Sequence, residues 1–232
     1  MILTANLPRL AALAKRAQRV LDVGGWFHPF NLATHVLDVM PYETRHRGNP
    51  IDPENAERFT SDTWTVYDAC RAPWPFPDKF FDFSFCSHTL EDLRDPIAVC
   101  AELLRVSRAG YIETPSRARE IFCKHRFAAL KRALGRMPPV GFDHHRWLVE
   151  AEGARLKFLA KDQRLVADRR NFITRGDLGR KLTETESGLG LFWEGEFLFE
   201  EVSLDDTAKL KSWRDAALAR LKAGPRPSTG SG

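Results

Sequence analysis

The sequence predicts an α/β protein built on a mainly parallel sheet, and one strand–helix–strand unit supports this most strongly. Residues 81–86 form a short, aromatic-rich apolar run, which is typical of a buried parallel strand. A helix is expected next, with Asp95 as its N-cap and Pro96 as its first residue. Gly110 is expected to end this helix, so that residues 111–113 enter the next strand. Short connections between these segments predict a right-handed βαβ unit.

Further elements follow from apolar spacing along the chain. Helices are expected over residues 8–19, 121–136 and 207–221, and strands over residues 20–23, 34–39, 64–67, 147–149 and 155–159, with a late hairpin or bulged strand over 191–200. Together they predict a Rossmann-like fold, a mainly parallel twisted sheet with helices on both faces and antiparallel edge strands. We expect residues 1–204 to form this domain, residues 205–223 a C-terminal helix packed on it, and residues 224–232 a disordered tail.

The bulk composition predicts an ordinary globular domain. The chain has 232 residues, 43% hydrophobic and 28% charged, which is enough for one sizeable core. No apolar run approaches the roughly 20 residues of a membrane span, and the N-terminus has no signal-peptide pattern. The four cysteines are widely spaced without a Cys-x-x-Cys pair, which favours reduced thiols. These observations predict a cytoplasmic protein.

Six short motifs occur in order in the middle of the chain. They are Asp68, the Pro73-Trp74-Pro75-Phe76 segment, Phe81-Asp82, the Ser87-His88-Thr89-Leu90-Glu91-Asp92-Leu93 segment, Asp95-Pro96, and Glu102 to Val106 followed by Gly110. In this order they resemble the second half of class I S-adenosylmethionine (SAM) methyltransferases that act on small molecules. The resemblance covers about residues 20–116. Asp92 stands where that family often has His, and Trp74 stands in a Leu position.

The resemblance implies SAM as the cofactor, bound at the carboxyl ends of the strands. It implies that Asp22 helps to place the ammonium group of SAM and that Gly24 and Gly25 let the backbone approach the donor. Asp38 would accept both ribose hydroxyls, and Asp68 would face the adenine amino group. The cofactor-binding residues expected in full are Asp22, Gly24, Gly25, Asp38, Val39, Asp68, Ala69, Ser87 and His88.

The segment after Gly25 departs from the family pattern. The later glycines are missing, and Pro29 disfavours a helix at this point. Few residues connect the first two strands, so we expect an irregular loop or one short turn in place of the usual first helix. Two alternatives stay open here: the chain binds SAM through a remodelled loop, or it no longer binds SAM.

Candidate catalytic residues lie where an acceptor would bind. They are His88 and Glu113, at the ends of two neighbouring strands, and His144 and His145, before a later strand. Adjacent histidines in a strand point to opposite faces, so at most one of the pair is expected to face the pocket. The alternative for His88 is a structural role without catalysis, and the alternative for His144 and His145 is a solvent-exposed or hydrogen-bonded turn. A metal site built from one of the pair with Glu113 or Glu120 is disfavoured because no helical ligand pair or cysteine cluster supports it, so no metal is expected.

Two functions from different classes remain. The first is a SAM-dependent methyltransferase (an EC 2.1.1-type transferase) for a small metabolite or a saccharide or lipid precursor. The second is a catalytically silent Rossmann-like module that binds a partner through the basic helix at residues 121–136, where basic residues greatly outnumber acids. The net charge of +4 does not by itself demand an anionic partner, and no Asn/Asp-Pro-Pro-Tyr motif follows residue 86, so nucleic acid is disfavoured. The oligomeric state is not predicted.

Overall fold

The computed structural model describes most of the chain. The described residues are 2–46, 51–123, 127, 130–131, 134–135, 140–162, 165, 168, 171–203 and 207–224. Half of the residues of the expected basic helix at 121–136 and nearly all of the expected disordered tail lie outside the described residues. Within the basic segment, the described residues Phe127, Leu130 and Leu134 are exposed.

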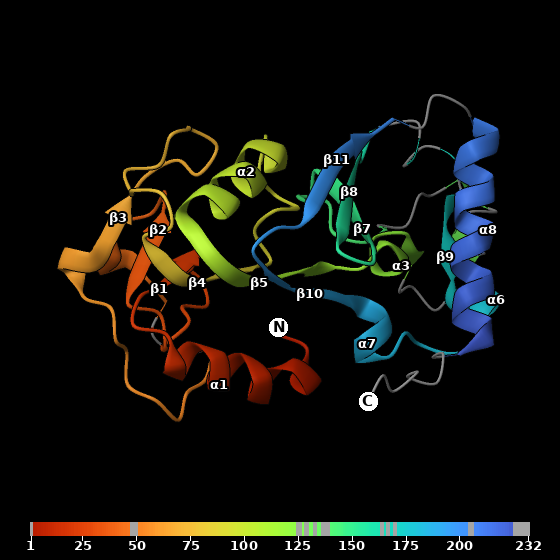
Figure 1. Ribbon diagram of the computed structural model, residues 1–232. Helices are drawn as coiled ribbons and strands as arrows, with labels where there is room; N and C mark the ends of the chain where they lie inside the picture. The colour runs from red at the N-terminus through yellow and green to blue at the C-terminus, as the bar shows by residue number, and fades with distance from the viewer. Residues whose placement is uncertain are drawn as a thin grey trace, which may run out of the picture.

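A six-stranded sheet forms the centre of the fold, with strand order β10-β5-β4-β1-β2-β3 (Figure 1). The first five strands in sequence are parallel to their neighbours, and β10 runs antiparallel to β5 at one edge. This confirms the predicted Rossmann-like, mainly parallel sheet with an antiparallel edge strand. The bounds are β1 Val20–Val23, β2 His35–Asp38, β3 Trp64–Val66, β4 Phe81–Ser87, β5 Ser107–Pro115 and β10 Gly188–Glu194.

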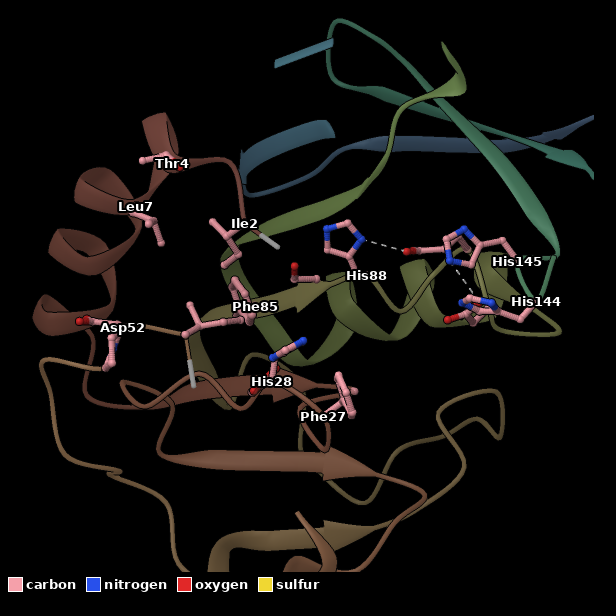
Figure 2. A pocket seen from close by; sticks show the side chains of 17 residues that line it. Ile2, Thr4, Leu7, Phe27, His28, Asp52, Phe85, His88, His144 and His145 are labelled. Atoms are coloured by element: carbon pink, nitrogen blue, oxygen red, sulfur yellow. Dashed lines mark ion pairs between the residues drawn. The ribbon is translucent and has the colours of Figure 1, made fainter. Parts of the chain in front are cut away.

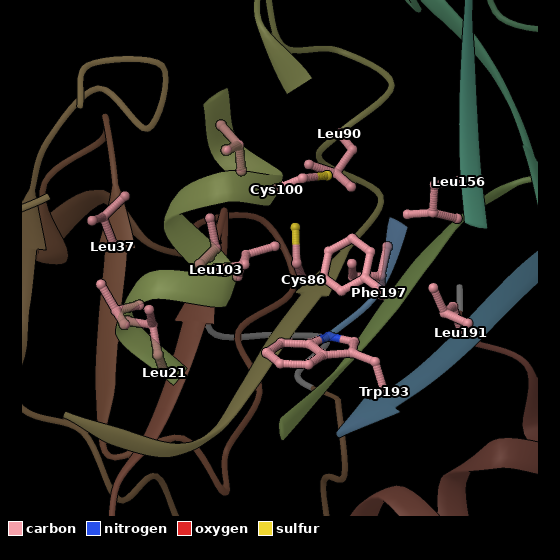
Figure 3. Packing of buried hydrophobic residues seen from close by; sticks show 14 of the residues in the cluster. Leu21, Leu37, Cys86, Leu90, Cys100, Leu103, Leu156, Leu191, Trp193 and Phe197 are labelled. Carbon is pink, nitrogen blue, oxygen red and sulfur yellow. The ribbon is translucent and has the colours of Figure 1, made fainter. Parts of the chain in front are cut away.

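One helix covers each face of this sheet (Figure 1). Helix α1, Leu7–Arg16, buries Leu10 and Ala14 against Val20 and Phe83 on one face. Helix α2, Pro96–Val106, packs on the opposite face, where its apolar side chains join residues of β1, β2, β4 and β10 in one core (Figure 3). Its N-cap forms as expected, because the Asp95 carboxylate accepts a hydrogen bond from the backbone N–H of Ala98 at 2.9 Å.

The second half of the chain forms two smaller sheets beside the large one (Figure 1). One contains β7 Trp147–Glu152, β8 Arg155–Ala160 and β11 Leu198–Val202, in the order β11-β8-β7, and the other pairs β6 Phe122–Cys123 with β9 Ile173–Thr174. Helix α8, Thr207–Ala223, buries Leu210, Ala217 and Leu221 against residues of these sheets. The short helices are α3 Arg117–Glu120, α6 Arg175–Leu178, α7 Glu184–Ser187, η1 Thr4–Asn6, η2 Tyr42–Thr44 and η3 Ser61–Thr63.

Two local expectations were wrong. Helix α2 ends at Val106 and β5 begins at once, so Gly110 lies inside a strand instead of ending the helix. A Cβ on Gly110 would lie 2.6 Å from the Ser84 hydroxyl and 2.7 Å from the Trp193 ring, so close packing requires glycine there. Residues 191–200 form no hairpin, because β10 pairs with β5 whereas β11 pairs with β8.

The bend between β10 and β11 has a physical reason. Gly195 takes a φ of +73°, and the buried Phe197 packs on Trp193, so the chain turns from the large sheet into the smaller one. The strands β7 and β8 do pair antiparallel as expected, but in this smaller sheet and not at the edge of the large one.

Candidate functional site

A cavity of about 660 Å³ lies at the carboxyl ends of β1 and β4 (Figure 2). Such edges of a parallel sheet are where ligands bind in open α/β folds. Its walls come from five parts of the chain. They are Ile2, Thr4 and Leu7 at the N-terminus, Asp22, Gly24, Phe27 and His28 around the first loop, Ile51, Asp52 and Pro53, then Phe85, Ser87, His88, Glu91 and Asp92 around β4, and finally His144 and His145.

The β1–β2 connection is irregular, as expected, with no helix over residues 24–34. Gly24 has a φ of +81°, and a Cβ there would lie 2.3 Å from the Thr89 hydroxyl. A Cβ on Gly25 would lie 2.2 Å from an Asp22 carboxylate oxygen. Glycine is therefore required at Gly24 for close approach to the segment after β4, and at Gly25 for close approach to the Asp22 carboxylate, although the later glycines of the family pattern are absent.

Asp22 is buried at the floor of the cavity. Its Oδ2 accepts a hydrogen bond from the backbone N–H of Phe30 at 2.9 Å. Burial raises the pKa of Asp22 to about 8, and the nearby Asp38 carboxylate adds to this, while the Phe30 hydrogen bond opposes it. A buried acid of this kind favours a cationic ligand group, since a positive charge nearby restores the ionised form.

Asp38 ends β2, as expected, but it does not line the cavity. Its two carboxylate oxygens accept hydrogen bonds from the backbone N–H of Trp26 at 3.0 Å and of Met40 at 2.8 Å. Burial raises the pKa of Asp38, and these hydrogen bonds oppose the shift. Asp38 thus holds the first loop against β2. Val39, the next residue, is 66% exposed and offers an apolar surface beside this carboxylate.

Asp68 and Ala69 lie away from the cavity walls. Asp68 accepts from the Cys70 backbone N–H at 2.9 Å and pairs with Arg94 at 2.7 Å, and these contacts lower the pKa of Asp68. Ala69 packs against the core on the α2 face, and its carbonyl accepts from the Trp74 indole N–H.

His88 lies at the end of β4 in a left-handed conformation, with a φ of +51°. Such a conformation is costly for a residue with a side chain, and it turns the imidazole toward two buried carboxylates. Nδ1 lies 3.3 Å from Glu91 Oε1, and Nε2 lies 3.5 Å from Glu113 Oε1. Burial alone would lower the pKa of His88, but the carboxylates of Glu113 and Glu91 outweigh it and raise the pKa to about 9.

We therefore expect His88 to be an imidazolium at neutral pH, which is unsuited to take a proton from an acceptor. In proton NMR titrations, its ring signals should shift near pH 9, well above the ordinary histidine range, and Glu91→Gln should lower that midpoint. Because the folded-state pKa exceeds the unfolded value of 6.5, this group stabilises the fold fully below pH 6.5 and loses that contribution as the pH rises through about 9. A titration midpoint near pH 6.5 for His88 in the wild-type protein would contradict its ion pairs with Glu91 and Glu113.

Glu113 was expected to face the acceptor, but in the structure its side chain is fully buried and does not line the cavity. The carboxylate accepts hydrogen bonds from the Leu3 backbone N–H at 3.0 and 3.1 Å and from the Tyr111 hydroxyl. Glu113 therefore anchors the N-terminal segment to the sheet and supports His88 from behind.

Both His144 and His145 line the cavity, so the expectation that at most one would do so was wrong (Figure 2). The physical reason is that they lie in a turn before β7 and not in a strand. His145 is buried, and its Nδ1 lies 2.7 Å from Glu120 Oε1. Lys161 pairs with the other Glu120 oxygen at 3.0 Å. Burial opposes ionisation of Glu120, but His145 and Lys161 outweigh it and lower the pKa of Glu120.

Several cavity residues had no signal in the sequence. The N-terminal residues Ile2, Thr4 and Leu7 reach the cavity through the Leu3–Glu113 hydrogen bonds, which join positions far apart in the chain. Asp52 and Pro53 follow a bridge that pairs Ile51 with Phe30. Glu91 and Asp92 were visible in the Ser87–Leu93 motif, but only the fold shows that their side chains face the cavity.

Comparison with known protein families gives a match over part of the chain. Residues 42–112 match a family described as a methyltransferase domain. This match begins after β2 and ends within β5, so it leaves out the remodelled β1–β2 loop. No curated protein matches the chain. No helix among the described residues has both the length and the apolar character needed to cross a membrane.

Solved structures with a similar arrangement are distant in sequence. A putative methyltransferase from Bacillus halodurans C-125 is 17% identical over 48% of this chain and 52% of that chain, with a TM-score of 0.36. A S-adenosylmethionine dependent methyltransferase from Mesorhizobium loti is 18% identical over 52% of this chain and 58% of that chain, with a TM-score of 0.35. The N-terminal domain of EvdMO1, in the presence of SAH and D-fucose, is 16% identical over 94% and 74%, with a TM-score of 0.36. The matched region thus spans about half the length of the first two proteins.

Proposed function

We propose that this chain is a SAM-dependent methyltransferase that transfers a methyl group from SAM to a small metabolite or a saccharide or lipid precursor, and the match of residues 42–112 to a methyltransferase domain supports this proposal. The observation that carries this proposal is the cavity at the carboxyl ends of β1 and β4, where donor and acceptor meet in a parallel sheet of this type. Its volume of about 660 Å³ is in the range of small-molecule sites.

The residues around the first loop fit the donor. Gly24 lines the cavity, and the missing side chain at Gly25 leaves room for the Asp22 carboxylate. Asp22 supplies a buried carboxylate for the ammonium group of SAM, and each oxygen of Asp38 can accept one more hydrogen bond beyond the backbone bond that it already has. Val39, exposed beside Asp38, supplies an apolar surface for the base.

Methyl transfer requires mainly that the enzyme position the donor and the acceptor. SAM, when bound, supplies an electrophilic methyl group that is transferred by in-line displacement. The chain holds the acceptor against that group in a cavity whose walls are partly apolar, through Ile2, Leu7 and Phe85. On the other side, His145 presents Nε2 to accept a proton, because Nδ1 is bonded to Glu120. His88, as a cation, keeps both ring nitrogens on the carboxylates of Glu91 and Glu113, so it contributes positive charge at the cavity wall and not a hydrogen bond to the acceptor.

The direct test is calorimetric titration of the purified chain with SAM and with S-adenosylhomocysteine, comparing the wild type with Asp38→Ala. We expect binding of both ligands by the wild type and at least about tenfold weaker SAM binding by the variant, since charge-assisted hydrogen bonds contribute roughly 1.5–3 kcal/mol each. The matched control is Asp62→Ala, which removes an exposed carboxylate at the amino end of β3, whereas Asp38 lies at the carboxyl end of the neighbouring strand β2. Unchanged affinity in a folded Asp38→Ala protein would remove Asp38 from the site.

A second candidate function is favoured by one observation. One Asp38 oxygen already accepts a backbone hydrogen bond from Trp26, in the loop that replaces the usual glycine-rich turn, and the other accepts from Met40 just after β2, as expected if the loop had closed over an unused site. The chain would then be a catalytically silent binding module acting through its basic segment. No heat with either ligand, together with steep salt dependence of binding to a polyanion, would support this alternative. Saturable binding of SAM would exclude it.

A further inference from the structure

Three side chains with metal-binding atoms converge at one end of the cavity, and Figure 2 labels two of them, His144 and His145. They are Asp92, which follows β4, and His144 and His145, which precede β7. One ligand atom from each lies within 4.8 Å of the others. The three residues come from segments about fifty positions apart in the chain, so the fold brings them together. Sequence alone disfavoured a metal because it shows no helical ligand pair, and a turn places these two histidines together instead.

The hydrogen bonds around His145 fix which of its nitrogens is available. Glu120 is fully buried and pairs with Lys161 at 3.0 Å, so it is an ionised carboxylate that can only accept a hydrogen bond. Nδ1 of His145, 2.7 Å away, must therefore carry the proton. In the neutral imidazole Nε2 then carries the lone pair, and it lies 3.8 Å from Asp92 Oδ1. That distance is long for a hydrogen bond but suits two ligands of one ion.

This arrangement has the outer shell that metal sites use. Histidine ligands usually donate their other ring N–H to a carboxylate, which fixes the tautomer and the ring orientation. Here Glu120 has that role, and Lys161 in turn holds Glu120. His144 is exposed, and its ligand atom already lies within 4.8 Å of those of the other two residues. Its ring packs edge-on against His145, with centroids 4.5 Å apart.

We propose that Asp92, His144 and His145 bind a divalent transition-metal ion at the acceptor end of the cavity. Two imidazoles and one carboxylate are a donor set that suits Zn²⁺ and its neighbours in the first transition series, and three protein ligands leave at least one coordination position open. The three residues line the same cavity as His88 and Glu91, so a bound ion would lie where an acceptor oxygen could reach it. The metal site is independent of whether SAM binds.

The test uses the full-length chain without an affinity tag, treated with chelator and then titrated with Zn²⁺ by calorimetry in the absence of SAM. The wild type should bind one equivalent. His144→Ala should weaken binding at least tenfold, and because His144 is exposed this variant is expected to keep its fold. Asp92→Asn, which keeps the shape of the side chain, should have a similar effect.

The matched control is His28→Ala, which removes an imidazole from the same cavity but outside the cluster. It should bind Zn²⁺ as the wild type does. Titration with Co²⁺ adds an independent readout, because its visible absorption bands should appear with the wild type and be lost in His144→Ala. Equal Zn²⁺ affinity in the wild type and His144→Ala, or no stoichiometric binding at all, would overturn the proposal. Failure of SAM binding in a separate titration would leave it standing.

Discussion

Replacing Asp22 by Asn should weaken SAM binding at least tenfold and at the same time raise the stability of the ligand-free protein. The two effects have one cause. Burial raises the pKa of the Asp22 carboxyl to about 8, so the folded protein holds a proton there that the unfolded chain releases near pH 4. The amide of Asn keeps an oxygen for the Phe30 N–H but carries no charge for the ammonium group of SAM.

The sign of the stability change follows from this pKa. Because the folded state binds the Asp22 proton more tightly than the unfolded state does, the free energy of unfolding of the wild type falls as the pH rises from about 4 toward 8. Asp22→Asn should remove this pH dependence. Above pH 8 the free energy of unfolding of the variant should exceed that of the wild type by roughly 1–3 kcal/mol, the usual cost of burying a polar group without full compensation.

Two measurements check this prediction. Thermal melts at pH 5 and pH 8.5 should show a larger stabilisation by Asp22→Asn at the higher pH. Calorimetry in buffers of different ionisation enthalpy should show that SAM binding to the wild type releases a proton near pH 7, and that the variant releases none. A variant that binds SAM as tightly as the wild type would show that the ammonium group lies elsewhere.

Local signals in the sequence predicted the central unit of the fold well. The apolar run of β4 and the Asp95 cap with Pro96 are short-range features, and the structure forms them where they were expected. The irregular β1–β2 loop was also predicted, because chain length and Pro29 alone exclude a normal crossover helix there.

Features that depend on tertiary contacts could not be predicted from the sequence. Gly110 has the signature of a helix terminator, but its position is decided by Ser84 and Trp193 on neighbouring strands. The separation of β10 from β11 depends on Gly195 and on burial of Phe197, which no periodicity reports.

In the candidate site, too, residues in local motifs were predicted, whereas contacts between distant segments were not. Asp22, Gly24, Ser87 and His88 were predicted from motifs and all lie on the cavity. Glu113 instead anchors the N-terminal segment, through a contact between Leu3 and β5 that no local pattern announces. The pairing of Glu120 with His145 is of the same kind, and it sets the largest effect that we expect on turnover.

His145→Ala should lower methyl transfer about a hundredfold, the low end of general-base effects, while SAM affinity changes little. The Glu120 carboxylate holds the proton of the neutral ring on Nδ1, so Nε2 is the nitrogen that can take a proton from an acceptor in the cavity. His88, with a pKa of about 9, cannot replace it as a base at neutral pH. Turnover is measured as the mass gain of one methyl on the acceptor that a panel of metabolites identifies, with thermal melts to confirm that the variant is folded.

Chelation separates the two ways in which this imidazole can act. If Nε2 takes the acceptor proton directly, chelator-treated wild type should remain well above His145→Ala in turnover. If Nε2 acts by holding a metal ion, chelation of the wild type should reduce turnover to the level of the variant, and added Zn²⁺ should restore the wild type but not the variant. Wild-type turnover in a folded His145→Ala protein would remove His145 from both roles, because a base or a ligand must lie within reach of the group it serves.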